Sequence, residues 1–176
     1  NDGPHHFGTA VFTSNQIVAA PVIWSRQVVK DHTVAAVLLN SGGANACTGA
    51  DGFVDTHHSA EKVAENLQIS ASDVAICSTG LIGVRLPMDS LLSGINVASQ
   101  SLKIESLHDA AEAIMTTDSV PKMAEVVLRG AHFSGIAKGA GMLAPAMATM
   151  LSVVMTDAEV DPEDLGQSLS DRGCGT

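Results

Sequence analysis

The sequence is poor in aromatic and charged residues. Its 176 residues include four Phe, one Trp and no Tyr, so that aromatic residues make up 3% and charged residues 16%. A hydrophobic content of 45% is nevertheless too high for a disordered chain. The length suits one domain or part of a larger one. We therefore expect a core of aliphatic side chains in which glycine allows close backbone contacts.

Basic residues and cysteines are scarce as well. Nine Lys and Arg stand against 19 Asp and Glu, and the formal net charge of −10 argues against nucleic-acid binding and against a polybasic membrane patch. Three Cys are too few for a disulfide scaffold, and because their number is odd they cannot all pair within the chain. No targeting segment, no membrane-length apolar run and no metal-ligand spacing stands out. These absences predict a cytoplasmic protein without nucleic acid, membrane or metal as partners.

Strand-like and helix-like patterns alternate along the chain, which predicts an α/β protein. The expected strands are residues 7–12, 34–39, 73–77, 125–128, 132–137 and 149–155. The expected helices are residues 51–67, 88–98 and 107–115. The strand at 34–39 does not alternate, which is typical of burial on both faces. Asp161 and Pro162 are expected to begin a last helix, as its N-cap and first residue.

The glycine-rich segment from Lys138 to Leu151 contains the sharpest chemical candidate. Its glycine spacing does not fit a phosphate-binding loop, and the plain alternative is a turn followed by a Met-rich core segment. The dipeptide Ala148-Thr149, however, suits an N→O acyl shift that converts the peptide into an ester and releases an N-terminal Thr149. The new α-amine, with a pKa of about 7.7–8.0, would then serve as the base for the Thr149 hydroxyl. The residues alone leave both interpretations open.

Two polar turns are further candidates. Backbone N–H groups around Thr79 and Gly80, directly after a predicted strand, suit an oxyanion hole, although the residues alone favour an ordinary strand-ending turn. Thr116, Thr117 and Asp118 end a predicted helix, where they suit either a polar substrate or a helix cap. Cys47 and Cys77 are expected to be small buried hydrophobic residues rather than nucleophiles.

Taken together, these segments resemble the glutamate N-acetyltransferase/ornithine acetyltransferase family of arginine biosynthesis, and are most similar to its actinobacterial members. The matching segments run in family order over almost the whole chain: AVFTSN at 10–15, AAPV at 19–22, LNSGGANACTG at 39–49, CSTGLIG at 77–83, LPM at 86–88, AIMTTD at 113–118 and KGAGMLAPAMATML at 138–151.

The resemblance implies the ornithine acetyltransferase/DmpA-like α/β fold, with layered sheets and helices and a self-cleaving Thr nucleophile. The precursor would cut itself between Ala148 and Thr149, and Thr149 would carry acetyl from N-acetylornithine to glutamate in a ping-pong cycle without a cofactor. Acetyl-CoA is a further acetyl donor for some members. Thr79 and Gly80 match the oxyanion-hole pair of the family. The residues that match its substrate-binding positions are Thr149, Lys138 and one of Thr116 and Thr117.

The resemblance also implies how the chain is organised. Residues 1–148 would form most of an α chain and residues 149–176 the start of a β chain, which stay associated and often assemble as α2β2. Because the family's chain is longer, we expect these 176 uncut residues to be a fragment with little or no activity of their own. Two alternatives remain: a related N-terminal-nucleophile aminopeptidase or hydrolase, which passes the acyl group to water, and a non-catalytic remnant.

Overall fold

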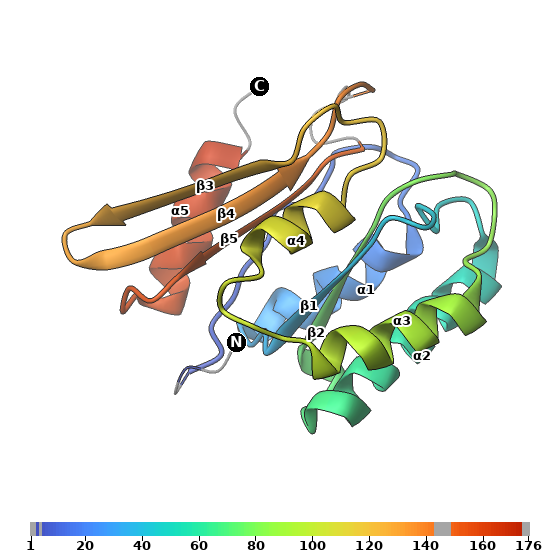
Figure 1. Ribbon diagram of the computed structural model, residues 1–176, viewed down its shortest axis with the longest axis horizontal. Coiled ribbons are helices and arrows are strands. Elements are labelled where there is room, and N and C mark those ends of the chain that lie inside the picture. The colour runs from blue at the N-terminus through green and yellow to red at the C-terminus, as the bar shows by residue number, and fades with distance from the viewer. Residues whose placement is uncertain (1–2, 4, 143–148, 174–176) are drawn as a thin grey trace.

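The structure is a computed structural model that describes residues 3, 5–142 and 149–173. It contains two sheets with helices layered around them (Figure 1). In the first sheet, β1 (Ala36–Asn40) runs parallel to β2 (Val74–Ser78). In the second sheet, β4 (Ala131–Lys138) lies between β3 (Lys122–Leu128) and β5 (Leu151–Thr156), and all neighbours are antiparallel. The helices are α1 (Ala20–Val28), α2 (Gly49–Leu67), α3 (Met88–Gln100), α4 (Leu107–Ala113) and α5 (Pro162–Gly173), with short 3-10 turns at Val29–Asp31 and Ala71–Asp73.

The larger hydrophobic core lies between α2, α3 and the first sheet. Ala60, Val63 and Ala64 fall on one face of α2 because residues three and four apart in a helix lie side by side. They pack against β2 and α3 through Val74, Ile76 and Ile95, all of which are buried. The core is therefore aliphatic, as the composition predicts.

Helix α1 covers the free edge of β2. The Trp24 indole donates to the Val74 carbonyl at 2.9 Å. The Ser25 hydroxyl donates to the Ile76 carbonyl and accepts from the Ile76 N–H, each at 2.8 Å, so one side chain replaces a neighbouring strand. The sequence patterns did not predict this helix. The signal that was available is Pro21, since proline is favoured in the first turn of a helix.

Helix α4 joins the two sheets and lies between them in Figure 1. Ala111 and Ile114, at the end of this helix, pack against Ile136 of β4 and against Leu39 of β1. The Ser41 hydroxyl, just after β1, also donates to the Ala113 carbonyl at 2.7 Å. These contacts fix the ends of β1 and β4 relative to one another.

Most of the expected elements are present, but two expectations are wrong. Residues 7–12 form no strand; only Phe7 makes an isolated bridge, to Thr33, because the facing segment is too short to continue the ladder. Strand β1 is not buried on both faces. Val37 is 39% exposed, because it points away from the core that receives Ala36 and Leu38.

The hairpin of β3 and β4 and the start of α5 are confirmed. The hairpin turns at Arg129 and Gly130, both with positive φ. The Asp161 carboxylate accepts from the Glu163 N–H at 2.9 Å, which makes Asp161 the N-cap of α5. No helix in the described part of the chain combines the length and the apolar character needed to cross a membrane.

Candidate active site

The loops that follow β1 and β2 are joined by backbone hydrogen bonds. The Thr79 N–H donates to the Asn40 carbonyl at 2.9 Å and continues the pairing of the two strands. Further along, the Ala44 N–H donates to Leu81 at 2.9 Å, and the Gly83 N–H donates to Ala46 at 2.8 Å. We call these loops, residues 41–48 and 79–87, the two-loop platform.

Gly80 lies where the two loops approach most closely. Its φ is +126°, and a Cβ atom built there would lie 3.0 Å from both Cα and N of Gly43 and 3.2 Å from the Ser41 carbonyl oxygen. A side chain would therefore meet backbone atoms that cannot move without separating the loops. The close approach explains why this position needs glycine.

Asn45 anchors the first loop to α2. It is fully buried with a left-handed φ of +49°, a conformation that Asn tolerates better than most residues. Its side-chain amide donates to the Gly52 carbonyl at 2.8 Å and to the Thr56 hydroxyl at 2.9 Å. Its carbonyl oxygen accepts from the Thr48 hydroxyl at 2.6 Å. A short buried network thus fixes the loop to the start of the helix.

Arg85 anchors the second loop to the same helix. Its guanidinium makes a two-bond contact with the buried Asp55 carboxylate, at 2.6 and 2.9 Å. The hydrogen bond to Asp55 raises the pKa of Arg85 further above its already high ordinary value. Both loops of the platform are therefore tied to α2.

Lys138 reaches the platform from the second sheet. It is the last residue of β4 and is 5% exposed. Its ammonium donates to the Thr79 hydroxyl at 2.9 Å and to the Thr116 hydroxyl at 2.7 Å. Among the described residues no carboxylate lies within ion-pair distance of it. A buried cation with only neutral partners is costly to maintain and is suited to meet an anion.

Asp118 fixes the backbone on both sides of the hydrogen bond between Lys138 and Thr116. Its carboxylate accepts from the Gly139 N–H at 2.8 Å and from the Thr116 N–H at 3.4 Å, and it is paired with Lys122. The hydrogen bond from Lys122, followed by that from Gly139, holds the pKa of Asp118 well below its ordinary value. The buried carboxylate therefore fixes Thr116 and Gly139 within the protein.

Thr149 lies at the same end of the second sheet as Lys138. Leu151 is paired with Lys138, and Thr149 comes two residues earlier. Its φ of +50° is strained for a β-branched residue. Its hydroxyl lies 3.0 Å from the Gly141 carbonyl and 2.7 Å from that of Met142.

The structure brings some of the predicted site residues together and not others. Thr79 and Thr116 share Lys138, and Gly80 follows Thr79 directly. Thr117 is exposed, and within the described residues its side chain makes no hydrogen bond to Lys138. The described residues also show no hydrogen bond from Thr149 to Thr79 or Lys138. Ala148 lies outside the described residues.

The cysteines differ from expectation. Cys47 is exposed, with a φ of +59°, so the prediction of a buried residue is wrong there: the residue lines a surface hollow by the starts of α1 and α2. Burial raises the pKa of the Cys77 thiol to about 11. That thiol is consequently protonated near neutral pH and is a poor nucleophile.

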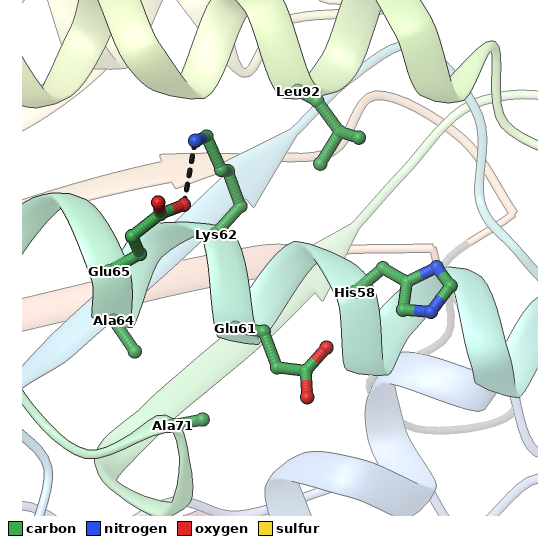
Figure 2. Close-up of a pocket in the computed structure, with 7 residues that line it drawn as sticks. All are labelled: His58, Glu61, Lys62, Ala64, Glu65, Ala71 and Leu92. Atoms are coloured by element: carbon green, nitrogen blue, oxygen red, sulfur yellow. Dashed lines mark hydrogen bonds and ion pairs between the residues drawn. The ribbon is translucent and has the colours of Figure 1, made fainter.

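Two surface hollows lie away from the contact between Lys138 and Thr79, although the second includes Cys47 and Thr48 of the platform. A hollow of about 460 Å³ on α2 is shown in Figure 2. It is lined by His58, Glu61, Lys62, Ala64, Glu65, Ala71 and Leu92, and its lysine is already paired with Glu65 at 2.7 Å. A second hollow, of about 260 Å³, lies by the starts of α1 and α2. Neither hollow is lined by Thr79 or Lys138. We therefore locate the candidate site by the hydrogen bonds of Lys138 and not by the size of a hollow.

Two solved structures share this fold. An ornithine acetyltransferase from Mycobacterium tuberculosis, complexed with ornithine, matches with a TM-score of 0.73 and 45% identity over 83% of this chain and 80% of that chain. The arginine biosynthesis bifunctional protein argJ from Bacillus halodurans also matches with a TM-score of 0.73, at 38% identity, over 84% of this chain and 79% of that chain. The fold is therefore the layered α/β fold of the ornithine acetyltransferases, as predicted.

The family follows from the sequence comparisons. The ArgJ family model matches residues 1–173. ArgJ of Streptomyces avermitilis is 56% identical over 169 residues, which are 96% of this chain and 44% of that protein. ArgJ of Thermobifida fusca is 56% identical over 163 residues, or 93% of this chain and 43% of that protein. This chain belongs to the ArgJ family, which confirms the resemblance in its sequence.

The chain spans about 44% of the length of two curated relatives from Streptomyces that it matches. These relatives are named for arginine biosynthesis, and the solved structures are named as an ornithine acetyltransferase and an argJ protein. None of these names describes an aminopeptidase or a hydrolase. The hydrolase alternative is therefore not favoured.

Proposed function

We propose that the full-length gene product carrying this sequence is an acetyltransferase of arginine biosynthesis, which moves acetyl from N-acetylornithine to glutamate through Thr149. One observation carries the proposal: the buried ammonium of Lys138 joins the Thr79 and Thr116 hydroxyls beside Gly80, at the end of the sheet where Thr149 lies. The ornithine bound in the relative that is 45% identical supports the choice of substrate.

Self-cleavage comes first in this proposal. The Thr149 hydroxyl attacks the carbonyl of residue 148, the acyl group moves from nitrogen to oxygen, and water hydrolyses the resulting ester. The strained φ of Thr149 supports this step, because breaking the preceding peptide bond removes the constraint on that torsion. Cleavage leaves β5 paired with β4 from Phe133 opposite Thr156 to Lys138 opposite Leu151. The two products, ending at residue 148 and beginning at residue 149, would therefore stay associated as α and β chains.

Acetyl transfer then proceeds in two half-reactions. The free α-amine of Thr149 takes the hydroxyl proton while the hydroxyl oxygen bonds to the acetyl carbonyl carbon, whose π electrons move onto the carbonyl oxygen. When the C=O bond re-forms, the ornithine amine leaves with that proton, and acetyl-Thr149 remains. The glutamate amine attacks the ester in the reverse sense and leaves as N-acetylglutamate. Neither half-reaction transfers electrons to an acceptor, so the cycle needs no cofactor, and acetyl-CoA would serve as an alternative acetyl donor.

The site residues take distinct roles. Thr79 and Gly80 would stabilise the oxyanion of each tetrahedral intermediate. Lys138 and Thr116 would bind the substrate α-carboxylate. We choose Thr116 over Thr117 because the Thr116 hydroxyl contacts the Lys138 ammonium. We place the enzyme in the cytoplasm, assembled as α2β2.

Steady-state kinetics of the purified full-length product test this function. Initial rates of N-acetylglutamate formation at several concentrations of each substrate should give the parallel double-reciprocal lines of a ping-pong cycle. Thr149→Ala should abolish the rate, whereas Thr156→Ala, at the far end of β5, should keep most of it. Release of acetate without acetylation of glutamate would favour the hydrolase alternative, and full activity of Thr149→Ala would exclude Thr149 as the nucleophile.

A further inference from the structure

We propose that Lys138 is a positioning residue for Thr79: it donates a hydrogen bond to the Thr79 hydroxyl, which then presents its own proton to the substrate oxyanion. The inference deepens the proposed acetyl transfer and rests on it. It gives the buried lysine a task that does not depend on a substrate carboxylate.

The backbone of Thr79 cannot be an oxyanion donor in this arrangement. Its N–H already donates to the Asn40 carbonyl at 2.9 Å, which extends the pairing of β1 and β2 by one residue. The donor that Thr79 can still offer is its hydroxyl. The described residues provide no hydrogen-bond partner for the Gly80 N–H, so a backbone donor and a side-chain donor stand next to each other.

The direction of the Lys138–Thr79 hydrogen bond follows from its chemistry. An ammonium group has three donors and no acceptor, whereas a hydroxyl has one proton and two lone pairs. At 2.9 Å the ammonium therefore donates, and the Thr79 oxygen accepts and keeps its own proton. No described residue accepts that proton in the structure. A positive donor also withdraws charge from the oxygen, which makes the hydroxyl a stronger donor.

The surroundings of Lys138 keep it in this position. Its ammonium donates a second hydrogen bond, to the Thr116 hydroxyl at 2.7 Å. Asp118 binds the backbone N–H groups of both Thr116 and Gly139, so that the lysine and its second partner are held by one carboxylate. Lys138 as a whole is only 5% exposed, and in such a buried place the charge of its ammonium acts more strongly on a developing anion than it would in water.

The competing role for Lys138 is direct binding of the substrate carboxylate only. An acetyl donor without a carboxylate separates the two roles. With p-nitrophenyl acetate, Thr149 also forms a tetrahedral intermediate that carries an oxyanion, and nitrophenolate leaves to give the same acetyl-Thr149, but the donor offers Lys138 no anion in its ground state. If Lys138 only binds the substrate carboxylate, its loss should not change the rate of acetylation by p-nitrophenyl acetate. If Lys138 orients the Thr79 hydroxyl, its loss should slow acetylation by this donor as well as by N-acetylornithine.

The experiment measures acetylation of Thr149 by p-nitrophenyl acetate, through nitrophenolate release and the mass of the acetylated chain. The two parts of the full-length product are co-expressed, with the second beginning at Met followed by Thr149. The free Thr149 amine then depends on removal of that Met rather than on self-cleavage. The variants are Lys138→Met, which keeps length but not charge, Thr79→Val, which keeps shape but not the hydroxyl, their combination, and Thr79→Ser as the conservative control.

We expect each single variant to slow acetylation by about 10²–10³-fold, the typical effect of losing one oxyanion donor. The double variant should be no slower than the slower single one, because the two side chains act as a unit. Thr79→Ser should stay within about tenfold of the unmodified protein, because it keeps the hydroxyl.

Three results would overturn the inference. A normal rate of Lys138→Met with p-nitrophenyl acetate, together with loss of its reaction with N-acetylornithine, would assign the lysine to carboxylate binding alone. Multiplying losses in the double variant would show that the two residues act independently. If the unmodified protein were acetylated by neither donor, the proposed function itself would fall, and the inference with it.

Discussion

The helix-flanked region of the molecule, made of α1, α2, α3, β1 and β2, differs sharply from the second sheet of β3, β4 and β5. In the first, β2 begins with three buried residues, and the cluster around Val74 and Ile76 is enclosed by helices. In the second, all seven residues of β3 are exposed, including Val126 at 58%. The two regions meet where the Lys138 ammonium contacts the Thr79 hydroxyl.

This difference assigns a separate task to each region. The helix-flanked region holds Thr79 and Gly80 on the two-loop platform, whose backbone is fixed by buried bonds to α2. The second sheet supplies Lys138 and Thr149 from strand ends, with Asp118 as the local anchor. The site therefore combines a tightly packed half with a half that depends on a few specific contacts.

The largest expected effect is on stability in the packed half. Ile76→Ala should lower the free energy of unfolding by about 2–5 kcal/mol, because removing this buried side chain leaves a cavity in a core enclosed by helices. Val126→Ala on exposed β3 should change it by no more than about 0.5 kcal/mol. Urea unfolding of the full-length product compares the two variants. Similar losses of unfolding free energy in both would contradict the distinction between the packed and the exposed region.

The next effect is on catalysis at the platform. Gly80→Ala should lower kcat/KM by about 10²–10³-fold, because its Cβ would meet the Gly43 backbone and displace the oxyanion donors that we propose at Thr79 and Gly80. Gly83→Ala is the matched control: its φ is also positive, at +81°, but its Cβ would meet nothing within 4 Å. Equal losses in both variants would attribute the effect to backbone strain instead of the contact between the loops.

A smaller effect is expected from the anchor of the first loop. Asn45→Ala should cost roughly 1–3 kcal/mol in unfolding free energy, because it removes the two buried hydrogen bonds that its amide donates to the Gly52 carbonyl and to the Thr56 hydroxyl. Cys47→Ala, in the same loop but exposed, should stay within about 0.5 kcal/mol of the unmodified protein. Thermal or urea unfolding measures the stability of both variants. If the unfolding free energy of Asn45→Ala equalled that of the unmodified protein, the network would not hold the loop.

The smallest expected effect is a pH dependence of the stability that Asp118 contributes beside the second sheet. The pKa of Asp118 is lowered by the fold, so its ionised form stabilises the protein fully above the unfolded value of about 3.9. That stabilisation is lost as the pH falls from about 4 towards the lowered pKa. Asp118→Asn should therefore be less stable than the unmodified protein near neutral pH, with a gap that narrows below about pH 4.

Urea unfolding across this pH range measures the gap. Glu125→Gln, on the exposed strand β3, is the control for losing one formal charge. A gap between Asp118→Asn and the unmodified protein that stays constant with pH would contradict the assignment of the ionised carboxylate as the anchor.

The sequence predicted what local patterns decide. The turn at Arg129 and Gly130, the long helix α2 and the cap at Asp161 each depend on neighbouring residues, and each is present. The strand predicted at residues 7–12 is absent, because a local sequence pattern cannot show whether a partner strand exists. Helix α1 was missed because its buried residues include Pro21 and Ser25, which do not read as an apolar stripe.

The site was predictable as a list of residues but not as an arrangement. The family resemblance selected Thr79, Gly80 and Lys138, yet the hydrogen bond from Lys138 to Thr79 joins positions 59 apart in sequence. Asp118 stood out as polar, but only the folded backbone shows that its carboxylate points towards Gly139. Such directions depend on tertiary packing, which no local pattern contains.

The most direct test of the account is the mass of the chain that carries Thr149. The purified full-length product should contain a break between residues 148 and 149. Incubation with N-acetylornithine should place one acetyl group on Thr149, and glutamate should then remove it. An uncut protein, or an acetyl group found on any other residue, would contradict the account.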